Sequence, residues 1–148
     1  PGEHGMLKLS KKVDYGLILL SRMRQHPEAA SARDMAGRYK LPAHMVANIL
    51  KQLATAGILV STRGAQGGYE LARDASQISL ADIVNALEGP IHLVDCVSEE
   101  LTCRFSAQCP THEPIQNVHR RFQAFMAAYK LDEIVGARHP APFQFQLR

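Results

Sequence analysis

The sequence predicts a mostly helical protein with one small β-hairpin, arranged as a winged helix-turn-helix that is followed by a long C-terminal helix. Two short helical patterns joined by a tight turn, with a glycine-rich hairpin directly after them, indicate the winged helix-turn-helix over residues 6–90. An amphipathic pattern indicates the long helix, which we place at residues 114–136. Between them, residues 91–113 are polar and without periodicity, so we expect a loop.

The first three helices are expected at residues 9–24, 31–40 and 43–57. Ser10 can cap the first helix, and Ser31 with Asp34 has the form of a capping box at the start of the second. Pro42 suits the first position of the third helix, and Gly57 suits its end. The third helix has an apolar stripe at helical spacing, which consists of Val46, Ile49, Leu50, Leu53 and Ala54.

Two β-branched or aromatic runs follow, residues 58–62 and 69–72, and the glycine-rich turn "RGAQGG" joins them. This pattern predicts the hairpin. A further helix is expected over "SLADIVNALEGP", because Ser79 and Asp82 have the form of a second capping box and Gly89 is a typical stop signal.

The basic charge is concentrated in the N-terminal half. Residues 1–75 hold 11 Lys and Arg against 6 Asp and Glu, a balance of +5, whereas residues 76–148 hold 6 against 8, a balance of −2. This asymmetry favours nucleic acid as a partner of the first half. No run of about 18 apolar residues is present, so we expect no membrane span.

In a helix-turn-helix, the start of the second helix reaches the base edges in the major groove. His44 and Asn48 lie there and can hydrogen-bond to bases, and asparagine can bind adenine with both ends of its amide. Lys51, one turn on, suits phosphates, as do Arg38 and Lys40.

The hairpin tip adds further candidate DNA contacts. Arg63 can enter a narrow minor groove, and Gln66 lies beside it in the sequence. The glycines that follow, Gly67 among them, let the backbone approach DNA closely.

The long helix is expected to form a homodimer. It carries large apolar residues outside the winged domain: Ile115, Val118, Phe122, Phe125, Met126 and Tyr129. Because DNA-binding domains of this size usually read two half-sites, packing on a second copy is favoured over folding back on the same chain. We expect His119, Arg120 and Arg121 on the solvated face of this helix. Residues 1–5 resemble a tag remnant, and residues 137–148 a loosely ordered tail.

All three cysteines lie in the predicted loop, at Cys96, Cys103 and Cys109, and His112 follows. An odd cysteine number without a secretion signal favours the reducing cytoplasm, where cysteines are more often metal-binding or redox-active than bridged. Tetrahedral zinc sites use tight CxxC pairs, which are absent here, whereas the wider C-x6-C-x5-C spacing suits an iron–sulfur cluster. His112 is a candidate fourth ligand. A metal-free thiol switch is the alternative.

The chain resembles the Rrf2 family of bacterial transcription regulators, which includes iron–sulfur cluster sensors of the IscR and NsrR types. The resemblance rests on "MLKLSKKVDYGLILL", on "RGAQGGYEL" followed by "ISLADIVNALEG", and on the three-cysteine loop that ends in "CPTH". It is greatest for the branch that regulates the SUF iron–sulfur assembly system. The family's wing arginine falls on Arg63. In one branch a glutamate reads DNA at the position that Ala47 occupies here. This chain therefore lacks, at that position, the carboxylate that would accept a hydrogen bond from the N4 amino group of cytosine.

The resemblance implies a homodimer built on the long helix and a [2Fe–2S] or [4Fe–4S] cluster held by Cys96, Cys103 and Cys109. Two patterns compete for the fourth ligand. His112 matches the family pattern with a histidine three residues after the last cysteine. Asp14 matches the pattern in which an aspartate near the start of the first helix is contributed by the partner subunit.

We therefore expect a cytoplasmic, cluster-sensing regulator that represses iron–sulfur cluster assembly genes and binds pseudo-palindromic promoter DNA as a homodimer. The alternative is a metal-free regulator in which cysteines are oxidised directly. No constellation of catalytic residues argues for an enzyme.

Overall fold

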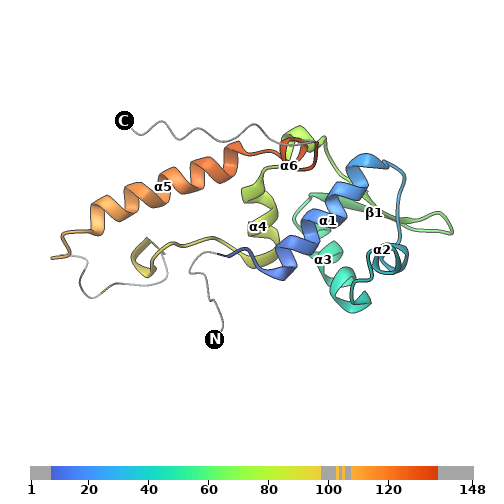
Figure 1. Ribbon diagram of the computed structural model, residues 1–148, viewed down its shortest axis with the longest axis horizontal. Coiled ribbons are helices and arrows are strands. Elements are labelled where there is room, and N and C mark those ends of the chain that lie inside the picture. Colours follow the sequence, from blue (N-terminus) through green and yellow to red (C-terminus); the bar gives the residue numbers. More distant parts are fainter. Residues whose placement is uncertain (1–7, 98–102, 104, 106–107, 137–148) are drawn as a thin grey trace.

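The computed structural model describes residues 8–97, 103, 105 and 108–136, so the predicted remnant 1–5 and tail 137–148 lie outside the described residues. The molecule is elongated, with the hairpin at one end and the start of the last long helix at the other (Figure 1). The elements in order are α1 (Lys11–Gln25), α2 (Ala32–Tyr39), α3 (Ala43–Thr55), β1 (Leu59–Thr62), β2 (Gly68–Leu71), η1 (Ala75–Gln77), α4 (Leu80–Glu88), η2 (Asp95–Val97), α5 (His112–Ala128) and α6 (Leu131–Gly136).

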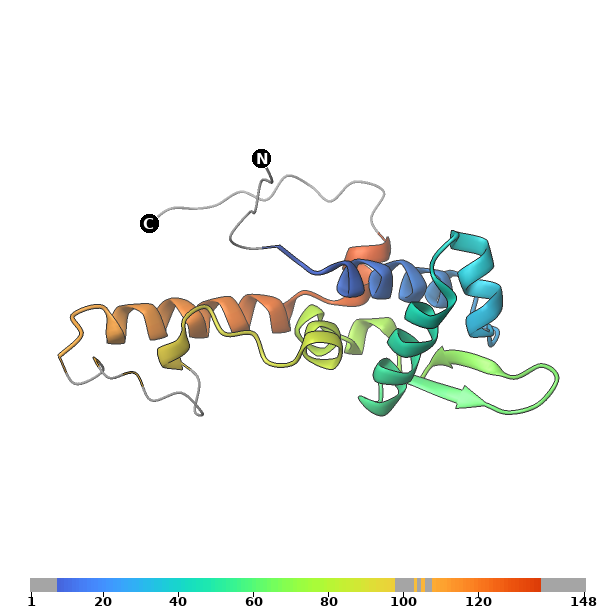
Figure 2. The same ribbon diagram turned by 90° about the horizontal axis from the view of Figure 1, so that it is seen from below.

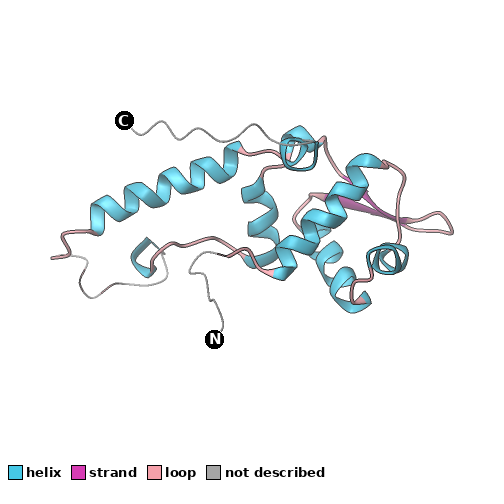
Figure 3. Cartoon of the chain, viewed as in Figure 1, coloured by secondary structure: helices cyan, strands magenta, loops and turns pink. Residues whose placement is uncertain are grey.

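The predicted winged helix-turn-helix is confirmed: three helices precede an antiparallel pair of strands, the only strands in the described part of the chain (Figure 3). Ser10 and Ser31 cap α1 and α2 through side-chain oxygens that accept backbone N–H groups. Lys40 takes the left-handed conformation in the tight turn after α2, with φ of 52°. Pro42 is the N-cap of α3, one position before the predicted place, and its carbonyl accepts from Met45 and Val46.

The end of α3 directs the chain into the hairpin. Gly57 has φ of +73°, its N–H donates to the carbonyl of Ala54, and the N–H of Ile58 donates to that of Leu53. These two hydrogen bonds form a Schellman motif, which needs a residue that tolerates positive φ.

The hairpin is tied to the loop after α1, a contact that the sequence analysis did not predict. Ala30 and Tyr69 exchange both backbone hydrogen bonds, at 3.1 and 2.9 Å. Gly68 lies against this bridge, and a Cβ there would be 2.5 Å from the Ala30 carbonyl oxygen. The start of β2 therefore needs glycine.

The segment 114–136, predicted as one dimerisation helix, is two helices. The helix α5 begins at His112 and ends at Ala128, and α6 begins at Leu131. Between them the chain pairs with residues 78–80 at the start of α4: Leu80 N–H donates to the Tyr129 carbonyl, and Leu131 N–H donates to the Ile78 carbonyl, each at 2.8 Å. This backbone pairing diverts the chain from the helical path.

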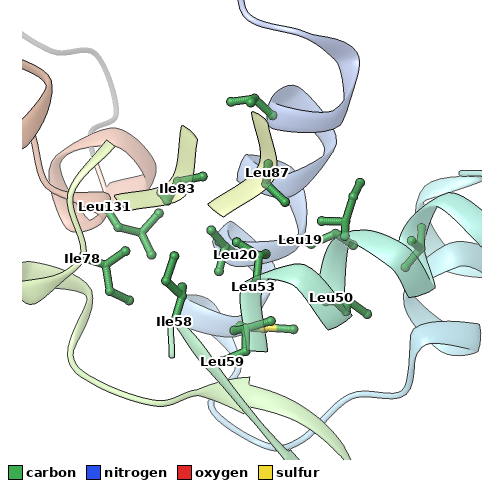
Figure 4. Close-up of a cluster of buried hydrophobic side chains, with 14 of the residues drawn as sticks. Leu19, Leu20, Leu50, Leu53, Ile58, Leu59, Ile78, Ile83, Leu87 and Leu131 are labelled. Carbon is green, nitrogen blue, oxygen red and sulfur yellow. The ribbon is translucent and has the colours of Figure 1, made fainter. Parts of the chain in front are cut away.

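The core lies where α1, α3, α4 and α6 meet the base of the hairpin (Figure 4). Leu131 at the start of α6 is fully buried in it, so the short last helix is part of the winged domain. The α1–α4 crossing is close, because a Cβ on Gly16 would lie 2.7 Å from a methyl carbon of Leu87. The other large buried side chains include Leu19, Leu20, Leu50, Leu53, Ile58, Ile78 and Ile83.

Candidate DNA-binding face and cysteine segment

The exposed face of α3 carries the predicted base-reading residues. His44, Asn48 and Lys51 are exposed, while Val46, Ile49, Leu50 and Leu53 on the other side are fully buried. The apolar stripe thus anchors α3 in the core and leaves its polar side free to meet DNA. Ala47 is also exposed, so a small side chain lies between the candidate contacts.

The wing tip presents Arg63 and Gln66 to solvent. The turn closes through a hydrogen bond from Gly67 N–H to the Gly64 carbonyl, at 3.0 Å. A Cβ on Gly67 would lie 2.2 Å from the Thr62 carbonyl oxygen, so only glycine fits this turn. The tight turn fixes the tip, from which Arg63 can extend.

The cysteine segment lies at the opposite end of the molecule from the wing (Figure 2). Cys96 is in η2, which packs against α5, and Cys109 is in the turn that leads into α5. Cys103 also lies in this segment; the three cysteines are half-buried, and no disulfide joins them. The described residues bring no three His, Cys, Asp or Glu side chains together as a metal-binding group.

The two candidate fourth ligands differ in their surroundings. Asp14 is exposed in the first turn of α1. His112 is half-buried at the first residue of α5. Its Nε2 accepts from the side-chain amide nitrogen of Gln116 at 3.1 Å, and its Nδ1 is buried without a hydrogen-bond partner among the described residues.

The thiol of Cys109 is favoured in its ionised form. The Thr111 hydroxyl lies 3.2 Å from Cys109 Sγ. This hydrogen bond, followed by that of the Thr111 backbone N–H, lowers the pKa of Cys109 below its usual value. A thiolate is both the metal ligand and the reactive form of cysteine, so the turn prepares Cys109 for either chemistry.

His119, which we expected on the solvated face of α5, is 6% exposed. Its ring stacks on that of His92, with centroids 6.0 Å apart and planes inclined by 23°. Its Nδ1 has no hydrogen-bond partner in the described residues. The helical spacing places His119 seven residues after His112, on the same side of α5. His119 therefore packs on His92, and η2, which carries Cys96, packs against the same helix.

The other side of α5 exposes large apolar side chains. Val118 is 52% exposed and Phe125 is 44% exposed. Near the C-terminal half of the same helix, an apolar hollow of about 460 Å³ lies between α1, α4 and α5. Its lining includes Leu9, Val13, Leu80, Val84, Phe122 and Met126.

Within the part of the chain that the structure describes, no helix has the length and apolar character needed to span a bilayer.

Residues 9–137 match the protein family described as Rrf2, iron-dependent transcriptional regulator. Among solved structures, the chain is similar to CymR of B. subtilis, described as its global cysteine regulator. The two are 27% identical over 88% of this chain and 97% of that one, with a TM-score of 0.68. It is also similar to IscR of T. potens, with 29% identity over 91% and 90% of the two chains and a TM-score of 0.66.

Proposed function

Because this chain belongs to the Rrf2 family of transcriptional regulators, we propose that it senses an iron–sulfur cluster and represses iron–sulfur cluster assembly genes. The observation that carries this proposal is the site at the start of α5. There the buried Nδ1 of His112, which has no hydrogen-bond partner in the part of the chain that the structure describes, closely follows Cys109, and the segment of Cys96 packs against the same helix. The similarity to IscR of T. potens supports the same sensing role.

The donor set fits such a cluster. Thiolate sulfur and imidazole nitrogen are both known cluster ligands, and a buried nitrogen without a partner suits coordination better than solvent contact. Cys96, Cys103 and Cys109 would hold the cluster, and His112, or Asp14 from a second copy, would supply the fourth ligand. When bound, the cluster supplies iron–thiolate bonds that are sensitive to oxidants.

The chain's own residues offer a route from this site to DNA. Ligation would tie the Cys96 segment and the Cys109 turn to the start of α5. The far end of α5 is joined to the winged domain through the backbone pairing of Tyr129 and Leu131 with residues 78–80 at the start of α4. A change in the order of the cysteine segment can therefore alter how α5, and with it a second copy, is held relative to α3.

We infer that α5 is also the dimer interface. Its exposed Val118 and Phe125 lie seven residues apart, on one side of the helix. Two copies related by a two-fold axis would present two α3 helices to a pseudo-palindromic promoter.

The test is iron and acid-labile sulfide per chain in protein purified without oxygen, together with its visible spectrum. Stoichiometric sulfide supports the cluster, and absence of both after reconstitution contradicts it. The cluster-loaded and cluster-free forms should then differ by about 5- to 150-fold in affinity for the target promoter, the usual range of allosteric coupling. Equal affinity would contradict sensing.

A metal-free thiol regulator is the second candidate. The lowered pKa of Cys109 favours it, as does the similarity to CymR, whose description is that of a cysteine regulator. This function predicts a reversible disulfide or sulfenic acid in iron-free protein after peroxide, measured by mass spectrometry, with a matching change in DNA affinity.

A further inference from the structure

A polar hollow of about 500 Å³ borders the exposed face of α3 on the side of α4. The helix α4 packs against α3, and the two ribbons lie next to each other in Figure 1. The lining of the hollow includes Asn48, Lys51, Gln52 and Thr55 of α3 and Asn85 and Ala86 of α4. Two candidate DNA contacts, Asn48 and Lys51, therefore share one hollow with an exposed residue of α4, Asn85.

The hollow lies beside the second half of α3, the half that approaches the DNA backbone. In a helix-turn-helix, the N-terminal residues of the second helix contact the base edges. Lys51 follows His44 by seven residues, which is about 10 Å along the helix axis. The major groove is only about 12 Å wide. With His44 at the bases, the end of α3 therefore lies near the phosphates at the edge of the groove.

Lys51 and Asn85 offer hydrogen-bond donors that are not engaged elsewhere. Both side chains are exposed, and neither makes a hydrogen bond or an ion pair within the part of the chain that the structure describes. The lysine ammonium has three N–H donors, and the asparagine amide has two. Phosphate oxygens accept from both kinds of side chain in protein–DNA complexes.

The helix α4 places no unpaired negative charge beside the hollow. Its two acidic side chains are both held by basic partners. Asp82 is paired with Arg73 at 3.3 Å, and Glu88 lies 3.8 Å from the ammonium of Lys12. Next to Asn85, the hollow is lined by the methyl group of Ala86, which leaves room for a DNA strand to come close.

We propose that Asn85 binds a DNA phosphate at the edge of the major groove, so that α4 and Lys51 of α3 hold the same strand. The inference rests on the DNA-binding part of the proposed function. Such a contact adds affinity and fixes the position of α3 without reading sequence. It also accounts for Gln52, whose amide oxygen is buried with no donor among the described residues. A water that bridges protein and DNA in the hollow supplies that donor.

The first test changes the charge at residue 85 in the full chain. The probes are a random-sequence DNA duplex and a duplex enriched from a random pool by the unsubstituted protein. Asn85→Lys should tighten binding to both and steepen the slope of log affinity against log salt by about one, because one more phosphate is neutralised. Asn85→Asp should weaken binding to both duplexes. The controls are Asn117→Lys and Asn117→Asp, the same changes at an exposed position near the start of α5, which should leave the slope unchanged.

The second test removes the amide. Asn85→Ala should weaken binding about 2- to 10-fold, the usual effect of losing one hydrogen bond. The factor should be equal for the two duplexes, because a phosphate contact carries no sequence information. The salt slope should stay the same, because the amide is uncharged. A loss confined to the enriched duplex would show that Asn85 reads bases and would overturn the phosphate contact.

Unchanged affinity and salt slope in Asn85→Lys and Asn85→Asp, or equal changes in the Asn117 pair, would also overturn the contact. This failure is distinct from failure of the cluster function, because binding to the random-sequence duplex requires neither iron nor sulfide. If the unsubstituted chain binds neither duplex even at low salt, the DNA-binding function and the contact from α4 fall together.

Discussion

At the scale of single residues, Asn48 and Lys51 lie on the same exposed face of α3 but should contribute differently to DNA binding. Asn48→Ala should cost about 1–3 kcal/mol at one base position and relax sequence preference there. Lys51→Ala should weaken binding to all sequences and reduce the slope of affinity against salt by about one. Titrations of promoter and unrelated DNA at several salt concentrations separate the two effects. A uniform loss from Asn48→Ala would contradict base reading.

Thr111 should set the reactivity of Cys109. The fold lowers the pKa of the Cys109 thiol. The ionised thiol therefore stabilises the folded state above the ordinary thiol pKa, and this stabilisation is lost as the pH falls through the lowered pKa of the folded state. In metal-free protein, Thr111→Val should move the pH profile of Cys109 alkylation to higher pH, read by peptide mass spectrometry. Thr111→Ser keeps the hydroxyl and should leave the profile in place. An unchanged alkylation profile in Thr111→Val would show that the Thr111 hydroxyl does not cause the lowered pKa of Cys109.

The stacked pair of His119 and His92 makes a separate prediction. His119→Phe keeps a ring in the buried site and removes a nitrogen that has no partner within the described ranges. Burying such a nitrogen costs about 1–3 kcal/mol, so stability should be equal or higher. His119→Ala should lose about 1–3 kcal/mol and speed hydrogen exchange in residues 91–97. Urea unfolding and hydrogen exchange measure these effects. Slower exchange in the alanine variant would contradict the stack.

At the scale of elements, α6 anchors the end of α5 to the winged domain. Leu131 is fully buried, so Leu131→Ala should destabilise the protein by about 2–5 kcal/mol. The half-buried Val135 on the same helix provides the matched control, and Val135→Ala should cost clearly less. Denaturant unfolding of both variants checks this. An equal loss of unfolding free energy in the two variants would contradict the view that burial of Leu131 holds α6 on the winged domain.

The local elements follow from local signals. The helices α1 to α4 and the hairpin were predicted because caps, turn glycines and apolar periodicity all act within a few residues. The Ser79–Asp82 capping box, with both reciprocal hydrogen bonds, is a direct example. The division of the 114–136 segment was missed, because its cause is backbone pairing with residues 78–80, far away in the sequence. The bridge between Ala30 and Tyr69 was missed for the same reason.

At the scale of the whole molecule, the proposed dimer depends on the exposed side of α5. Val118→Glu should yield a monomer in sedimentation velocity experiments and weaken binding to a two-half-site promoter, because a charge would be buried between two apolar surfaces. Gln123→Glu places the same charge at another exposed position of α5 and should leave the dimer intact. A Val118→Glu dimer with unchanged affinity would place the interface elsewhere.

The sequence by itself determined the type of each N-terminal element, the exposed face of α3 and the grouping of three cysteines, because periodicity, caps and spacing are local properties. It left the fourth ligand open between His112 and Asp14. Only the tertiary structure decided that His119 is buried against His92, that His112 keeps a buried nitrogen with no partner among the described residues, and that the helix ends between α5 and α6. Each of these depends on which distant segment packs against α5, since burial and long-range backbone pairing are properties of the folded chain.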